Sequence, residues 1–165
     1  MTIPAVYLFG FLLVAACWDW RFRKVPNALL FPSMLLGISY QIWIGGGWRS
    51  AGGVGIAFVL SFLPVVLRSM GMGDQKLLMA VGAWTSGQVV YTLFLLSLLI
   101  GMCLLLCRPH RWRSLHDNLL RLSAGWLAHR QIWLPSHEQS AMALPYAVCL
   151  FLAFCLWSWE GAGWG

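Results

Sequence analysis

Long runs of apolar residues, separated by short polar or glycine-rich breaks, dominate this chain. The segment 89–107 shows almost no polar face, whereas a surface helix of a soluble protein carries polar residues with a period of 3.6. Several runs contain about 17 to 20 residues, the length that a helix needs to cross roughly 30 Å of hydrocarbon. The pattern therefore predicts membrane-spanning helices.

The order of runs and breaks predicts six helices. They cover residues 3–18, 28–44, 54–67, 75–84, 89–107 and 141–159. The breaks between them are the polar elbow "DWRFRKVPN", the stretch "GGGWRSAGG", the turn "RSMGMGD", the stretch "TSGQ" and a basic loop over 108–139. Clusters of glycine, asparagine, proline and serine are typical of such breaks.

The fourth segment is short, because the distance from Asp74 to the break at Thr85 is only about 18 Å at 1.5 Å per residue. Fusing it with the next helix would give five crossings instead of six. Charge favours six, because ten of the eleven Lys and Arg residues then share one side and only Arg49 lies on the other, as the positive-inside bias requires. The ten are Arg21, Arg23, Lys24, Arg68, Lys76, Arg108, Arg111, Arg113, Arg121 and Arg130.

Composition supports the same class of protein. The 165 residues are 60% hydrophobic and only 10% charged, with a mean hydropathy of +0.74, so they cannot cover a core with a water-compatible surface. We expect an all-α, polytopic membrane protein with one domain over 1–165 and both termini on the non-cytoplasmic face. The first helix has no cleavage signal after it and should stay attached.

The basic loop 108–139 has its own pattern. Apolar residues recur about three and four positions apart from Leu115 to Trp133, which predicts an amphipathic helix. This helix either lies on an anionic cytoplasmic leaflet or packs on the cytoplasmic ends of the bundle. We expect membrane lipids, and no nucleic acid, as its partners.

Metal binding is not predicted. The five cysteines lie inside predicted helices and form no Cys-x-x-Cys pair, so a packing role is favoured. Cys103 and Cys107 share a helix face, which leaves a metal site as the less favoured alternative. No cofactor is expected.

Two of the few carboxylates occupy special positions. In the six-helix topology Asp19 ends the first helix and Asp74 begins the fourth, so both lie at the cytoplasmic boundary, where a carboxylate is costly. Two carboxyls that meet there cannot both ionise easily, and the pair can share a proton. Such a pair suits aspartic protease chemistry, in which one carboxylate activates water and the other, protonated, polarises the peptide carbonyl. Simpler roles are a helix N-cap for Asp74 and an ion pair with Arg23 for Asp19.

The segments around the two aspartates form a pair of motifs. Asp19 lies in Asp-x-Arg-x-x-x-Val-Pro-Asn, and Asp74 lies in Gly-x-Gly-Asp-x-Lys. In this order, with two apolar helices between them, the motifs resemble those of the type IV prepilin peptidases, the membrane aspartic proteases of the Gly-x-Gly-Asp class. The resemblance extends to "LLMAVGAW" after Asp74 and to the six-helix layout.

The resemblance implies that Asp19 and Asp74 are the catalytic dyad. Gly71 and Gly73 would let the backbone turn tightly and let an extended substrate approach. Pro26 would open the second helix.

Three further motif residues are polar. Asn27 lies beside the proline of the first motif. Arg21 and Lys76 would hold the turn to lipid headgroups or to neighbouring carbonyls, or would only satisfy the positive-inside bias.

Larger members of that family carry a cytoplasmic segment with two Cys-x-x-Cys pairs and are associated with methylation as well as cleavage. This chain begins almost directly at its first helix, so it resembles the short peptidase-only form of tight-adherence (Flp-type) pili, and we expect no methyltransferase activity. The implied substrate is a pilin or pseudopilin precursor, cut at the cytoplasmic face of the bacterial inner membrane between a short basic leader and a hydrophobic helix.

Two alternatives of another class remain. The chain would be a catalytically silent subunit of a pilus or secretion assembly, or a small transporter in which Asp19 and Asp74 relay protons or bind a cation. A relay usually places ionisable groups at several depths, and no predicted apolar helix has an internal acid or base.

Overall fold

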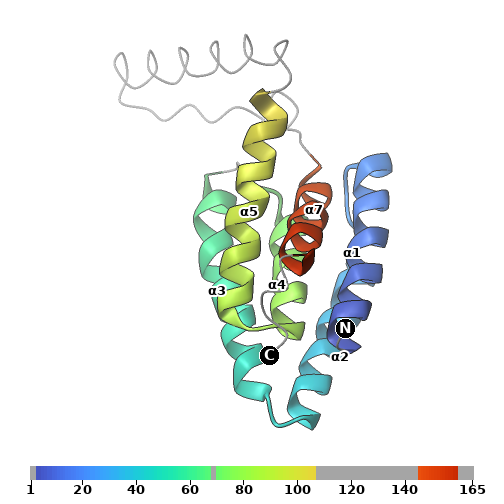
Figure 1. Cartoon of the computed structure of the whole chain (residues 1–165), viewed down its shortest axis with the longest axis vertical. Helices are drawn as coiled ribbons and strands as arrows, with labels where there is room; N and C mark the ends of the chain where they lie inside the picture. Colours follow the sequence, from blue (N-terminus) through green and yellow to red (C-terminus); the bar gives the residue numbers. More distant parts are fainter. Residues whose placement is uncertain (1–2, 68–69, 107–144, 160–165) are drawn as a thin grey trace.

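The computed structural model describes residues 3–67, 70–106 and 145–159, and these residues form helices joined by short turns (Figure 1). The all-α class is confirmed for this part of the chain. The basic loop 108–139 and residues 141–144 of the last predicted helix lie outside the described residues. The described helices are α1 (Ile3–Phe22), α2 (Asn27–Trp43), α3 (Gly47–Val66), α4 (Met72–Trp84), α5 (Gly87–Leu106) and α7 (Tyr146–Trp159).

The short helix α4 lies in the middle of the bundle, where it contacts α1, α2, α3, α5 and α7 (Figure 1). Nearly every side chain from Leu77 to Trp84 is buried. Small and apolar side chains let five neighbours approach one helix closely. The bundle therefore forms around the helix that carries Asp74.

Three helices, α1, α3 and α5, are long and apolar enough to cross a membrane, and α7 is apolar but has only 14 residues. Large hydrophobic side chains such as Val59 and Leu99 are exposed on the outside of the bundle. Such a surface marks a membrane interaction, because lipid rather than water must cover it. The chain is accordingly an integral membrane protein.

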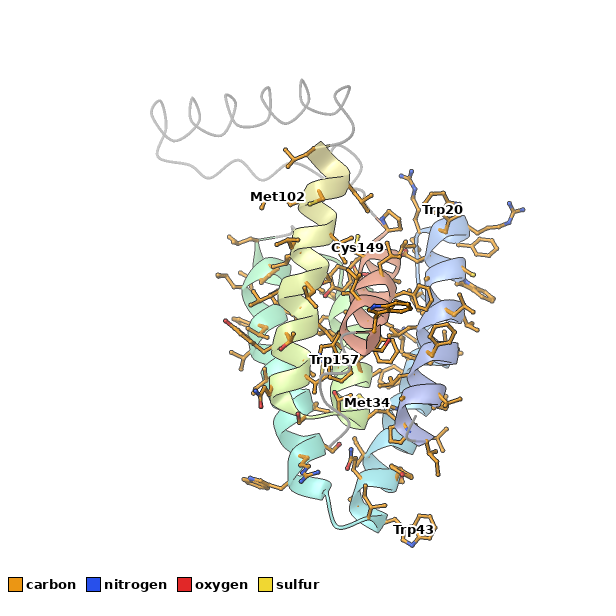
Figure 2. The ribbon with its side chains drawn as sticks, in the orientation of Figure 1. Trp20, Met34, Trp43, Met102, Cys149 and Trp157 are labelled. Atoms are coloured by element: carbon orange, nitrogen blue, oxygen red, sulfur yellow. The ribbon has the colours of Figure 1, made fainter. Side chains whose placement is uncertain are left out.

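Exposed tryptophans lie at both ends of the bundle. Trp20 lies at one end and Trp43 at the other (Figure 2). Trp48 is also exposed and lies on the other side of the short turn that joins α2 to α3. Indole rings prefer the interface between lipid and water. Asp19, next to Trp20, therefore lies at the level of one such interface.

The start of α3 corrects the prediction that "GGGWRSAGG" is a break. The helix begins at Gly47, and only Ile44, Gly45 and Gly46 connect it to α2. The physical reason is close packing, because a Cβ on Gly53 would collide with the backbone carbonyl of Gly82 in α4. Glycine costs stability inside a helix, but here it lets two backbones approach.

The last carbonyls of α4 are satisfied inside the bundle. The side-chain amide of Gln41 donates to the carbonyl of Trp84 at 2.9 Å, and the hydroxyl of Ser50 donates to the carbonyl of Ala83 at 2.9 Å. The indole N–H of Trp84 in turn donates to the carbonyl of Ser33 at 2.9 Å. These hydrogen bonds pair carbonyl groups at the end of α4 that have no partner within the helix. The helix, which has 13 residues, can therefore end inside the bundle, where no water is available.

Candidate active site

Asp19 lies in the last turn of α1, and its side chain is only 5% exposed. The prediction that Asp19 ends the first helix is wrong, because α1 continues to Phe22. The helix ends at Arg23, which adopts a left-handed conformation with φ of 52° and donates its backbone N–H to the carbonyl of Asp19 at 2.8 Å. Asp19 is therefore held by a regular helix rather than by a loop.

The carboxylate of Asp19 reaches the beginning of α7. The backbone N–H of Ala147, the second residue of α7, donates to Oδ2 of Asp19 at 3.1 Å. Arg23, the partner predicted for Asp19, is close enough for its charge to favour the ionised form of this carboxyl. Burial opposes a negative charge at Asp19, whereas the N–H of Ala147 and, less strongly, the charge of Arg23 favour it.

Asp74 lies in the first turn of α4, three residues after the N-cap. The predicted fourth helix began at Gln75, but α4 begins at Met72 with Gly71 at the N-cap position. Asp74 is therefore not the N-cap itself. Its backbone N–H donates to the carbonyl of Gly71 at 3.1 Å, and its carboxyl has a hydrogen bond to the backbone of Gly71, in the manner of a capping box.

The two aspartates lie at the same end of the bundle, near enough for the charge of Asp19 to act on Asp74. Asp74 is at the amino end of α4, outside the three helices that are long enough to span a membrane. Burial and the charge of Asp19 raise the pKa of Asp74 to about 7, while the hydrogen bond to Gly71 acts in the opposite direction. The charges of both carboxylates also reach the thiol of Cys149 in α7. The two carboxyl groups therefore interact through their charges.

Lys76 and Asn27 connect the two motifs. The ammonium Nζ of Lys76 donates to Oδ1 of Asn27 at 3.2 Å and lies 5.3 Å from the ring centroid of Phe31. Pro26 is the N-cap residue of α2 and places Asn27 at its first helical position. The start of α2 is thereby tied to the first two turns of α4.

Arg21 stands apart from this arrangement. Its side chain is exposed, and its guanidinium lies 5.9 Å from the ring centroid of the adjacent Phe22. The structure gives Arg21 no contact with Asp19 or Asp74 among the described residues.

The two motif glycines differ in their surroundings. Neither has a positive φ, so neither uses the left-handed conformation that favours glycine, and Gly73 lies within α4. A Cβ on Gly71 would lie 3.3 Å from Oδ2 of Asp74, tighter than an ordinary contact. A Cβ on Gly73 would meet no atom within 4 Å. A side chain at position 71 would therefore crowd the carboxyl of Asp74, which explains a glycine there, whereas open space lies beside Gly73.

The amino end of α7 belongs to the site, although sequence reasoning missed it. Besides Ala147 and Cys149, it contributes Tyr146, whose hydroxyl is 3.3 Å from the hydroxyl of Ser97 in α5. The available signal was Pro145, because proline often precedes the first turn of a helix, where backbone N–H groups are free. No group of three or more His, Cys, Asp or Glu within residues 3–67, 70–106 and 145–159 is arranged to hold a metal ion.

The structure thus defines an all-α membrane protein in which two carboxyl groups that interact through their charges lie at one end of a helical bundle. Residues 6–106 match the type IV leader peptidase family, and the chain belongs to that family.

Two curated relatives are similar to this chain. It is 28% identical over 138 residues to the prepilin leader peptidase/N-methyltransferase of Pectobacterium carotovorum subsp. carotovorum, a match that covers 75% of this chain and 47% of that protein. It is 29% identical over 143 residues to the protein of the same name from Aeromonas hydrophila, covering 77% of this chain and 49% of the relative. The chain thus spans about half the length of these relatives. No solved structure matches it.

Proposed function

We propose that this chain is a membrane aspartic endopeptidase that removes the short basic leader from type IV pilin-like (Flp-type) precursors. The observation that carries the proposal is the pairing of Asp19 and Asp74, in which burial and the charge of Asp19 together raise the pKa of Asp74 to about 7. One carboxyl of such a pair is ionised and the other protonated near neutral pH. That is the state in which the pair can act as base and acid together.

The dyad would hydrolyse a peptide bond without a covalent intermediate. The ionised carboxylate takes a proton from water as the water oxygen attacks the peptide carbonyl carbon. The protonated carboxyl donates to the carbonyl oxygen, where negative charge would otherwise develop. Burial strengthens both interactions, because little water competes for the carboxyl groups.

The substrate must reach Asp74 in an extended form. The open space beside Gly73 supports this part of the proposal, because a peptide backbone could lie against the first turn of α4 there. Lys76 would keep that turn in place through Asn27 rather than contact the substrate.

The membrane context completes the proposal. We place the protein in the bacterial inner membrane with six crossings and with the dyad at the cytoplasmic face, in contact with lipid headgroups. The hydrophobic helix of the precursor would remain in the bilayer while its basic leader extends into the cytoplasm. Membership of the leader peptidase family and the names of both relatives support the substrate class.

Co-expression with pilin-like precursors encoded nearby tests this function. Removal of the leader is measured by a gel shift, and mass spectrometry of the new N-terminus locates the cut. We expect cleavage between the basic leader and the hydrophobic helix. Precursors that all stay intact beside a well-expressed, membrane-inserted chain would instead favour a silent assembly subunit.

A further inference from the structure

The first turn of α7 makes an unusual contact for a helix end. The first four N–H groups of a helix have no acceptor within it, and they carry a partial positive charge. The N–H of Ala147 is one of these groups, and it donates to Oδ2 of Asp19 at 3.1 Å across 128 positions of sequence. The backbone of α7 thus supplies a hydrogen bond that suits an ionised carboxylate.

The surroundings of the two carboxyls are unequal. Asp19 receives the N–H of Ala147 and feels the positive charge of Arg23. Asp74 also has a hydrogen bond from the backbone of Gly71, but no such cation lies close to it among the described residues, because the ammonium of Lys76 is turned towards Asn27 and the ring of Phe31. When two adjacent carboxyls share one proton, the proton resides on the carboxyl whose ionised form is less well stabilised.

We propose that the amino end of α7 fixes the roles within the dyad, holding Asp19 as the ionised general base and leaving Asp74 as the protonated general acid. This inference rests on the proposed function and deepens it. Ala147 is a positioning residue here, because its backbone acts on Asp19 and does not touch the substrate.

With Asp19 as the base and Asp74 as the acid, the proton transfers of the hydrolysis balance. Asp19 accepts a proton from water while the water oxygen bonds to the carbonyl carbon, and Asp74 gives its proton to the carbonyl oxygen. The resulting gem-diol then collapses: the carbon–nitrogen bond breaks, Asp19 passes its proton to the leaving amine, and a diol hydroxyl returns a proton to Asp74. Both carboxyls end in their starting states.

The charged and titratable groups that face Asp19 determine how its protonation depends on pH. They are Arg23 on α1, Asp74 on α4 and Cys149 near the start of α7, while Tyr146 at the start of α7 lies near Asp74. A thiol and a phenol are ordinarily uncharged below pH 8, so Arg23 and Asp74 are the charges that matter.

Replacement of one amide by an ester tests the inference. Lactic acid in place of Ala147, introduced by nonsense suppression, removes the N–H that Asp19 accepts and keeps the side chain. The matched control is the hydroxy acid analogue of valine at Val148, whose N–H donates to the carbonyl of Pro145 at 3.1 Å rather than to a carboxylate. The cleavage rate of a precursor is measured for both proteins between pH 4 and pH 9.

We expect the ester at Ala147 to move the acidic limb of the pH–rate profile upward by about one pH unit, because the base then loses its stabilised ionised form. The ester at Val148 should keep the parent profile. If the parent cleaves but the acidic limb stays in place with the ester at Ala147, the role of α7 is wrong. A parent that cleaves no precursor would instead refute the proposed function.

A second measurement covers the case in which the ester protein does not fold. The chain has a third aspartate, Asp117, so the carboxyl carbons of aspartate-labelled protein give few signals, assignable with the Asp→Asn variants. In the intact parent at pH 6 we expect the Asp19 signal at the position of an ionised carboxylate and the Asp74 signal at that of a protonated acid. The reverse order would overturn the assignment.

Discussion

Asp19 and Asp74 are the only acidic residues in the part of the chain that the structure describes, and neither side chain is fully exposed to solvent. Asp19 is buried in a helix, and Asp74 is partly buried in a first helical turn. A carboxylate in such a place is costly unless it is paired or used. We propose that the different charges around the two residues give them different tasks.

The pH dependence of cleavage follows from Asp74. Its pKa is raised from 3.8 to about 7 by burial and by Asp19, so the carboxyl keeps its proton well above the pH at which an ordinary aspartate ionises. Because the acid must be protonated to act, activity should fall as the pH rises through about 7. The measurement is the rate of leader removal in membranes from pH 5 to pH 9. A rate that is constant up to pH 9 would contradict this role.

Chelation is expected to have no effect. The proposed chemistry uses two carboxyls and water, so EDTA should leave the cleavage rate within a few fold of the untreated value. The assay is leader removal after dialysis against EDTA, with re-addition of Zn²⁺ or Mg²⁺ as the control. Activity that vanishes on chelation and returns with metal would point to a metalloenzyme.

At the scale of helices, the apolar runs predicted where the helices lie but not where all of them begin. The ends of α2 and α5 agree with the predicted ranges within two residues. The start of α3 was missed because Gly53 is explained only by its contact with Gly82, which is 29 positions away. Local sequence cannot show that a distant backbone will compensate for the cost of glycine in a helix.

The crossing of α3 and α4 can be tested with neighbouring glycines. Gly53→Ala should lower the free energy of unfolding by about 1–3 kcal/mol, because the new methyl group collides with the backbone of Gly82. Gly52→Ala is the control, since a Cβ there meets nothing within 4 Å, and it should leave stability unchanged or raise it by up to about 1 kcal/mol. Thermal unfolding in detergent compares the two. Equal midpoints would contradict the close crossing.

At the scale of the whole molecule, the two motifs are brought to one end because α1 runs towards it and α4 runs away from it (Figure 1). Sequence reasoning placed Asp19 and Asp74 at a common boundary, since each adjoins a break between apolar runs. It did not find Ala147, because a backbone N–H has no side-chain signature and lies 128 positions from its acceptor. The contact exists only once α7 packs on α1.

The charge asymmetry predicts the orientation of the bundle. A reporter fused after Arg113 should read cytoplasmic, and one fused in "GGGWRS" at Gly46 should read external, because the basic residues favour the cytoplasmic side. Alkaline phosphatase and green fluorescent protein fusions give complementary readouts. An external reading at Arg113 would place the dyad on the wrong face for the proposed substrate.

The most direct test of the acidic dyad is a set of charge-removing variants assayed for leader removal. Asp→Asn keeps the size of the side chain and removes its proton exchange, so Asp19→Asn and Asp74→Asn should each lower cleavage by at least about 100-fold while the protein still accumulates in the membrane. The matched variants Asp117→Asn, Glu138→Gln and Glu160→Gln should stay within a few fold of the parent. An Asp74→Asn protein that still trims its precursor within a few fold of the parent rate would contradict the catalytic dyad and leave Asp74 as a helix cap.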